Sequence, residues 1–148
     1  MNTNLSGYIE NDVHFFPLRV YFSDTDAGGI VYHSNYLDMA EHARTEWLHL
    51  MNIDHRKYLK ERGLVFVVRS IKADYIAPAF LDETLIVKSQ MKKVGKFSME
   101  ILQEVIRDDK VLSSLEIKLG YISVETGRPS VMPDEWLEIF ETIIEDKA

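Results

Sequence analysis

The sequence has no cysteine among its 148 residues, which excludes disulfide bonds, thiolate metal sites and cysteine nucleophiles. It also has no run of about 18 apolar residues, the length that crosses a bilayer as a helix. Residues 1–12 lack the basic start and the apolar stretch of a signal peptide. We therefore expect a cytoplasmic protein that does not insert into membranes.

Positive charge is scarce as well. Lys and Arg number 17 against 24 Asp and Glu, so the net charge is −7 with neutral His, which argues against nucleic acid as the main partner. The chain contains no internal repeat and no low-complexity linker, and its length is typical of one domain. With 46% hydrophobic residues it can form a core, and we expect a single domain over residues 1–148.

Alternating apolar residues predict a first strand over about residues 14–24. The residues that share its apolar face are Phe16, Leu18, Val20 and Phe22. Asp24 and Asp26 continue the same alternation, so we expect them near a core-facing position.

Helices are predicted at three places. Gly28 and Gly29 end the first strand, and Ser34 or Asn35 can cap a long helix over about residues 36–51. Its apolar stripe consists of Tyr36, Ala40, Ala43, Trp47, Leu50 and Met51. A shorter helix is expected over about residues 54–61, and a last helix begins near Pro133.

After the second helix the apolar residues recur at period two for about sixty residues, which predicts four consecutive strands. In the first of these, one face is expected to carry Val65, Val67, Ile71, Ala73 and Tyr75. Strands joined by such short turns must be antiparallel. The predicted fold class is α+β, with an antiparallel five-stranded sheet that curls around the long helix or is covered by a second subunit.

The segment between the first strand and the long helix carries the strongest candidate site, because it places two carboxylates and a histidine at a helix N-terminus. Burial of Asp26 would make its carboxylate a stronger base, able to attack a carbonyl or to deprotonate water. The alternative is that Asp24 or Asp26 only caps the turn by accepting backbone N–H bonds. The free N–H groups at the helix start favour a developing oxyanion. His33 could orient a carbonyl, protonate a leaving group, contact a cofactor or serve as a structural hydrogen-bonding group.

The sequence lacks the motifs that usually indicate a metal site, a hydrolase nucleophile elbow or a nucleotide site. No two of the five histidines are spaced at i and i+4, and we expect no metal site. The sequence has no GxSxG nucleophile elbow, no GxxxxGK[ST] phosphate loop and no GxGxxG motif.

Two basic clusters stand out against the acidic background, in residues 56–62 and 92–96. They form either a solvated surface or a rim for a phosphate-bearing ligand such as coenzyme A, or for an acidic acyl carrier protein. Arg69 interrupts an apolar strand face, so it is paired with an acid, lies at a bulge or points to a dimer interface.

The stretch Asp24-Thr-Asp-Ala-Gly-Gly-Ile-Val-Tyr-His-Ser-Asn-Tyr36 resembles the signature of the hotdog-fold acyl-CoA thioesterases of the 4-hydroxybenzoyl-CoA thioesterase family. The continuation Ala43-Arg-Thr-Glu-Trp-Leu48 is similar to the branch associated with the tol-pal cell-envelope system. The resemblance covers roughly residues 14–130. It implies a hotdog fold, in which the sheet wraps a long central helix, and homodimers or homotetramers with active sites at the dimer interface.

The resemblance also implies roles for single residues. Asp26 matches the catalytic carboxylate, a nucleophile or general base toward the thioester carbonyl, and oxyanion donors come from N–H groups at the helix start. We expect His33 to act with Asp26, and Tyr32, Asn35 and Tyr36 to bind the substrate. The hydroxybenzoyl branch has an aromatic residue at the position of His33, so the substrate expected here is another acyl-CoA or acyl carrier protein thioester.

The implied reaction is hydrolysis to a free acid and coenzyme A, without a metal or recycled cofactor. Two alternatives remain from the sequence. One is a hotdog hydratase or dehydratase, in which a carboxylate and a histidine move protons at a β-carbon. The other is a noncatalytic scaffold that binds acyl carrier protein or enzymes of cell-envelope synthesis.

Overall fold

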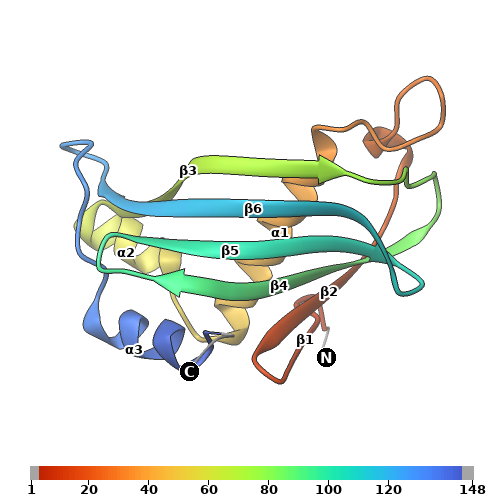
Figure 1. Ribbon diagram of the computed structural model, residues 1–148. Coiled ribbons are helices and arrows are strands. Elements are labelled where there is room, and N and C mark those ends of the chain that lie inside the picture. The colour runs from red at the N-terminus through yellow and green to blue at the C-terminus, as the bar shows by residue number, and fades with distance from the viewer. Residues whose placement is uncertain (1–3, 145–148) are drawn as a thin grey trace.

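The computed structural model describes residues 4–144, so both ends of the expected domain lie outside the described residues. Figure 1 shows the strands laid side by side with the longest helix behind them. In chain order the elements are β1 (Tyr8–Glu10), β2 (Val13–Arg19), the 3₁₀ turn η1 (Phe22–Asp24), α1 (Asn35–Leu50), α2 (His55–Arg62), β3 (Leu64–Tyr75), β4 (Thr84–Val94), β5 (Ser98–Arg107), β6 (Lys110–Ser123) and α3 (Asp134–Thr142). None of the helices in residues 4–144 is long and apolar enough to span a membrane.

The strands form one antiparallel sheet in the order β1-β2-β4-β5-β6-β3. This sheet has six strands, so the expected number of five is wrong. The additional strand is β1, which pairs with β2 through a tight turn whose residues Asn11 and Asp12 both have positive φ. With three exposed residues, β1 shows no apolar alternation that periodicity could detect.

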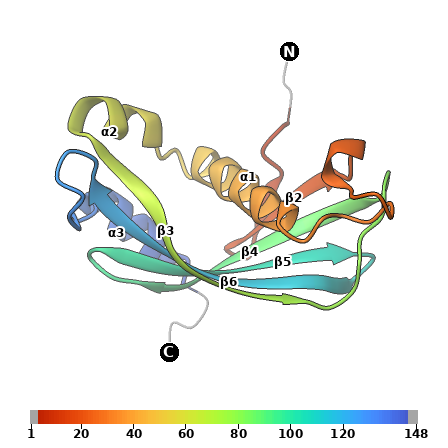
Figure 2. The same cartoon turned by 90° about the horizontal axis from the view of Figure 1, so that it is seen from above.

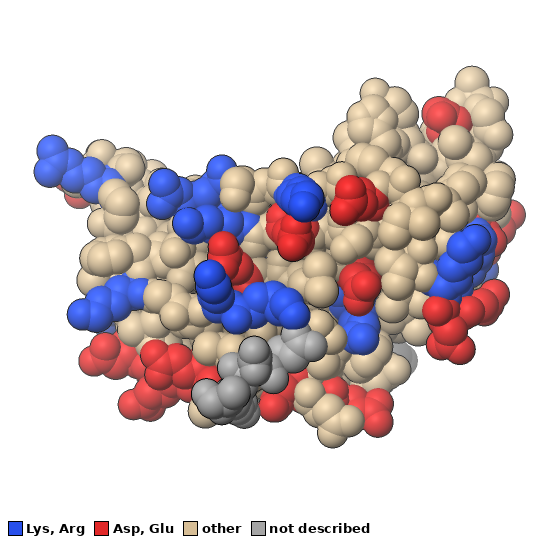
Figure 3. All heavy atoms as spheres, in the orientation of Figure 1, with Lys and Arg blue, Asp and Glu red and all other residues tan. Residues whose placement is uncertain are grey.

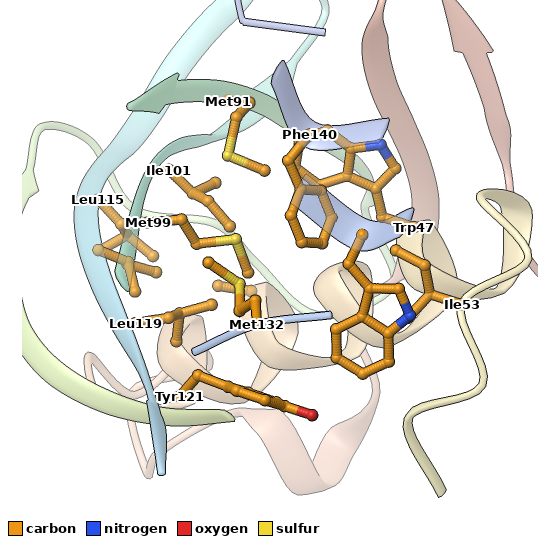
Figure 4. Close-up of a cluster of buried hydrophobic side chains, with 13 residues drawn as sticks. Trp47, Ile53, Met91, Met99, Ile101, Leu115, Leu119, Tyr121, Met132 and Phe140 are labelled. Carbon is orange, nitrogen blue, oxygen red and sulfur yellow. The ribbon is translucent and has the colours of Figure 1, made fainter. Parts of the chain in front are cut away.

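The sheet curves, and α1 lies against its concave face (Figure 2). The side of α1 that faces the sheet consists of the buried residues Tyr36, Met39, Ala40, Ala43 and Trp47. These residues divide between two apolar clusters. One cluster gathers around Tyr36 near the start of the helix, and the other, shown in Figure 4, gathers around Trp47 and is closed by Phe140 of α3.

A β-bulge changes which residues of β3 face the helix. The register against β6 shifts between Val68 and Ser70, which leaves Arg69 as the extra residue. Of the three placements expected for Arg69, the one at a bulge is confirmed. The bulge moves Phe66 and Val68 to the face that carries Ile71, so the expected grouping of Val65 and Val67 with Ile71 is wrong. Opposite the bulge, Gly120 leaves room for the Arg69 side chain, whose Cδ would lie 2.7 Å from an added Cβ.

The convex face of the sheet and its outer edge at β3 differ in polarity. The convex face carries interspersed Lys, Arg, Asp and Glu side chains (Figure 3), with the ion pairs Lys72–Glu116 and Lys93–Glu100 at 3.7 and 3.8 Å. Among residues 4–144, no strand neighbours the outer edge of β3. Along that edge strand the apolar residues Val68, Ile71 and Tyr75 are 40–47% exposed.

Candidate active site

The segment that joins β2 to α1 is a loop held by its own backbone. Asp26 N–H donates to the carbonyl of Ile30 (2.9 Å), and Tyr32 N–H donates to the carbonyl of Asp24 (3.0 Å). Gly29 has a φ of +81°, which a glycine adopts without strain. These contacts fold residues 24–32 into a small hairpin that rises above the β3 edge in Figure 1.

A second segment, residues 76–83, holds this loop against the sheet, and we call this segment the clip. Val31 N–H donates to Ala79 O (2.9 Å), and Ile30 forms a bridge with Phe80. The clip is itself fixed by Arg107, whose Nη1 donates to Glu83 Oε1 (2.8 Å) and to Pro78 O (3.2 Å). The position of the loop therefore depends on a half-buried ion pair as well as on backbone pairing.

Between the two segments lies an open hollow of about 440 Å³. Its lining residues are Asp26, Ile30, Val31, Tyr32, His33, Tyr36, Tyr75, Ile76, Ala77 and Pro78. The structure thus brings four of the five expected site residues to one place. Asn35 is not among the lining residues, because its side-chain amide donates to the carbonyl of Asp24 (2.7 Å) and so holds the loop.

Aromatic rings form one wall of the hollow. The exposed His33 ring contacts Tyr32 at a centroid distance of 4.6 Å and Tyr75 edge-on at 5.9 Å. Tyr36 is buried beside Tyr75, and its hydroxyl accepts a hydrogen bond from Ala79 N–H (3.2 Å). Burial raises the pKa of Tyr36, so this phenol stays protonated at neutral pH. Its position makes Tyr36 an anchor for the clip at the floor of the hollow.

Asp26 is exposed in this chain, so the expectation of a core-facing position is wrong. The apolar alternation of β2 stops at Val20, and the turn η1 then leaves Phe22 81% exposed. The turn-capping alternative describes what both carboxylates do here. Asp24 Oδ2 accepts from Tyr21 N–H and Asp26 Oδ1 accepts from Gly28 N–H, each at 2.8 Å. The second oxygen of Asp26 is left for other partners.

The start of α1 opens toward the same hollow. Asn35 N–H donates to Tyr32 O and Leu37 N–H donates to Ser34 O. Within residues 4–144, the N–H groups of Ser34 and Tyr36 donate to no backbone carbonyl. The N-terminus of a helix of 16 residues carries a partial positive charge, so this is a favourable position for a developing oxyanion.

Residues 20–140 match the family described as the Thioesterase-like superfamily. The chain belongs to this thioesterase-like superfamily. It is 38% identical over 120 residues, 81% of this chain and 88% of the relative, to the acyl-CoA thioesterase YbgC of Haemophilus influenzae. It is 37% identical over 135 residues, 84% of this chain and 98% of the relative, to the protein of the same name in Helicobacter pylori. The YbgC relatives fit the tol-pal-associated branch indicated by the sequence signature.

Solved structures of this superfamily share the fold. A probable thioesterase from Bartonella henselae superposes with a TM-score of 0.76 at 28% identity, covering 82% of this chain and 99% of that chain. A 1,4-dihydroxy-2-naphthoyl-CoA thioesterase from Synechocystis superposes with a TM-score of 0.79 at 20% identity, covering 91% and 97%. The α+β architecture is thus that of known hotdog thioesterases.

Several residues of the site had no signal, or only a weak one, in the sequence. Tyr75 is marked in the sequence only as the last residue of a predicted apolar strand face, since nothing in the sequence places the end of β3 beside His33. The Arg107–Glu83 pair joins residues 24 positions apart, which no local pattern reveals. Among residues 4–144, no group of three or more His, Asp or Glu side chains is placed to hold a metal ion.

Proposed function

We propose that this protein is a cytoplasmic acyl-CoA thioesterase that hydrolyses a thioester to the free acid and coenzyme A in the hollow between Asp26 and Tyr75. The observation that carries the proposal is the meeting of Asp26, His33 and the N-terminus of α1 in one hollow. It is supported by 38% identity with a relative named as an acyl-CoA thioesterase.

In the proposed reaction the thioester carbonyl oxygen points at the start of α1. The N–H groups of Ser34 and Tyr36, which no backbone carbonyl engages, are the candidate oxyanion donors. Asp26 takes a proton from a water molecule, and the water oxygen attacks the carbonyl carbon. The C–S bond then breaks and the thiolate of coenzyme A takes up a proton, for which His33 on the wall of the hollow is the candidate donor.

A nucleophilic route uses the same residues. Asp26 attacks the carbonyl directly, coenzyme A leaves, and water hydrolyses the resulting anhydride. Label in the Asp26 carboxylate after a single turnover in ¹⁸O-labelled water identifies the nucleophilic route. Label enters the Asp26 carboxylate only when the anhydride is opened by attack of water on the Asp26 carbon, and mass spectrometry of the peptide detects it.

We further propose that two copies associate along the exposed edge of β3. No strand within the described part of the chain pairs with this edge, and its apolar side chains are exposed, a combination that favours pairing with another strand. Because β3 ends at Tyr75, a second copy on this edge would border the hollow. Light scattering of the parent and of Ile71→Lys tests this. A parent of one-chain mass would contradict the dimer.

The test of the reaction is the release of free thiol from a panel of short-chain, long-chain and aromatic acyl-CoA thioesters and from acyl carrier protein thioesters. We expect Asp26→Asn to lower kcat/KM by about 10²–10⁴-fold. Asp38→Asn is the matched control, because Asp38 lies exposed in the first turn of α1 and outside the hollow, and it should retain activity.

Three outcomes would contradict the proposal. Equal activity of Asp26→Asn and the parent would remove Asp26 from the mechanism. A change in the double bond of crotonyl-CoA without free thiol would indicate a hydratase. Complete inactivity of the parent, together with capture of acyl carrier protein that persists in Asp26→Asn, would indicate a scaffold.

A further inference from the structure

A second cavity lies at the other end of α1, beside the cluster drawn in Figure 4, and six side chains of that cluster line it. Its volume is about 110 Å³. Most of its walls are apolar, and three methionines, Met51, Met91 and Met99, contribute to them together with Ile101 and Phe140. Its lining includes the exposed residues Glu41 and Thr45, so the cavity opens to solvent and a small molecule can enter it.

Polar groups gather on one side of this cavity. Arg44 and Thr45 of α1 and His55 of α2 contribute to its lining. Thr45, Leu48 and His55 also line a neighbouring surface hollow of about 580 Å³, which includes Arg56. The arrangement is a mainly apolar cavity that shares its rim with a wider surface hollow. Arg44 lies in the wall of the cavity, and Arg56 lies with Asp54 in the wall of the hollow.

The rim contains a buried hydrogen-bonding atom without a partner. The Nε2 atom of His55 is shielded from solvent and bonds to nothing within residues 4–144. Buried polar atoms are almost always hydrogen-bonded, so such an exception points to a missing partner. An apolar cavity of ~150 Å³ in a protein core can remain dry and admit a benzene-sized molecule. The interior here is therefore suited to an apolar group of similar size, with oxygen atoms at the rim.

We propose that this cavity binds a medium-chain monocarboxylic acid. The alkyl chain lies among Met91, Met99 and Phe140, and the carboxylate lies at the entrance, where Arg44 and His55 can donate to it. Arg44 Nη1 already donates to Gln103 (2.9 Å), which leaves its other N–H groups for a ligand. Glu41 in the cavity and Asp54 in the neighbouring hollow both oppose a further negative charge, so the guanidinium groups of Arg44 and Arg56 are both needed to favour the acid.

The cavity is separate from the candidate active site. The two share no lining residue. Tyr36 at one and Leu48 at the other are twelve residues apart on α1, a distance of about 18 Å along the helix. A fatty acid bound here would leave the hollow at Asp26 open. The inference therefore goes beyond the proposed reaction and does not require it.

The test is a titration with hexanoate, octanoate and decanoate, each below its micelle concentration, followed by calorimetry and by tryptophan fluorescence. Trp47 lines the cavity and should report occupancy. We expect saturable binding with one site per chain. The matching 1-alkanols should bind at least about tenfold more weakly, because they lack the charge that Arg44 and Arg56 attract.

Variants assign the binding to this cavity. Leu48→Phe fills the space from α1 and should weaken binding at least about tenfold, and Thr45→Phe, on the exposed rim, does the same if Leu48→Phe is unstable. Leu50→Phe is the matched control on the same helix, since Leu50 is 37% exposed and lines neither cavity. Asp26→Asn should bind like the parent.

The inference is overturned if none of the three acids binds saturably, or if Leu50→Phe weakens binding as much as Leu48→Phe. It is also overturned if Asp26→Asn abolishes binding, because the acid would then occupy the candidate active site. Binding by a parent protein that releases no thiol would support this inference and contradict the proposed reaction. Thiol release by a parent protein that binds none of the three acids would support the proposed reaction and contradict this inference.

Discussion

Replacement of Gln103 by methionine should destabilise the fold more than any other single change to a buried polar group near α1. Gln103 is fully buried on β5. Its Nε2 donates to Ala40 O (2.9 Å) and to Ser89 Oγ (3.0 Å), and its Oε1 accepts from Arg44 Nη1 (2.9 Å). This one amide therefore joins the middle of α1 to two strands.

The magnitude follows from the three hydrogen bonds. A bond to a charged group contributes about 1.5–3 kcal/mol, and each neutral bond contributes about 1 kcal/mol. Gln103→Met removes all three and leaves the fully buried hydroxyl of Ser89 and the half-buried guanidinium of Arg44 without this partner. We expect a loss of about 3–5 kcal/mol, which is a large part of the ~5–15 kcal/mol typical of a domain.

Urea unfolding measures this loss. With a slope of about 2 kcal/mol/M, the midpoint should fall by roughly 2 M. Gln90→Met is the matched control, because it is the same substitution on the opposite, convex face of β4, where Gln90 is half-buried. It should shift the urea midpoint little. A loss below about 1 kcal/mol for Gln103→Met, or equal losses for the two variants, would refute the reasoning.

Two further predictions concern pH and the clip. Burial lowers the pKa of His14 below its ordinary value of 6.5, so the unfolded chain takes up a proton there before the folded chain does, and stability should fall as the pH falls through about 6.5. The Tm of His14→Phe should therefore fall less between about pH 7 and pH 5 than that of the parent, measured by calorimetry. Arg107→Met removes the ion pair to Glu83 that fixes residues 76–83, and we expect kcat/KM for thiol release to fall by about 10–10²-fold as the hollow loosens.

Controls for these predictions come from exposed residues of the same type. His42 lies on the solvent face of α1, so His42→Phe should keep the acid sensitivity of the parent. If His42→Phe loses as much acid sensitivity as His14→Phe does, burial of His14 is not the cause of the acid sensitivity of the parent. Lys93→Met breaks the exposed pair with Glu100 on the inner strands β4 and β5, away from the β3 edge, and should leave kcat/KM unchanged. Equal rates for Arg107→Met and the parent would show that the clip does not position the site.

The helix starts were predictable to within one or two residues, although Ser34 at the N-cap of α1 forms no capping hydrogen bond through its side chain. Asp54 caps α2 by accepting from Lys57 N–H (2.9 Å), and Gly63 ends it with a left-handed φ of +64°. Pro133 precedes α3 as expected. These signals act within four residues of the chain, so sequence alone contains them.

The errors came from features that depend on neighbouring strands. β1 is too short to show a period, and the bulge at Arg69 reverses the alternation of β3 without any change in composition. The same limit applies at the site. The motif around Asp26 and His33 was visible in sequence, whereas the turn η1 that exposes Asp26, and the placement of Tyr75 beside His33, depend on how β2 and β3 end.

The exposure of Asp26 links the proposed reaction to the proposed dimer. A carboxylate becomes a better base when water is displaced from around it, and residues 4–144 of one chain leave Asp26 open on one side. The surface that borders this opening is the end of the unpaired β3 edge at Tyr75, which a second copy would cover under the proposed pairing. We therefore infer that the hollow is completed only in the dimer, so that Ile71→Lys, which places a charge on the edge far from the reacting atoms, should lose thioesterase activity in parallel with dimer mass.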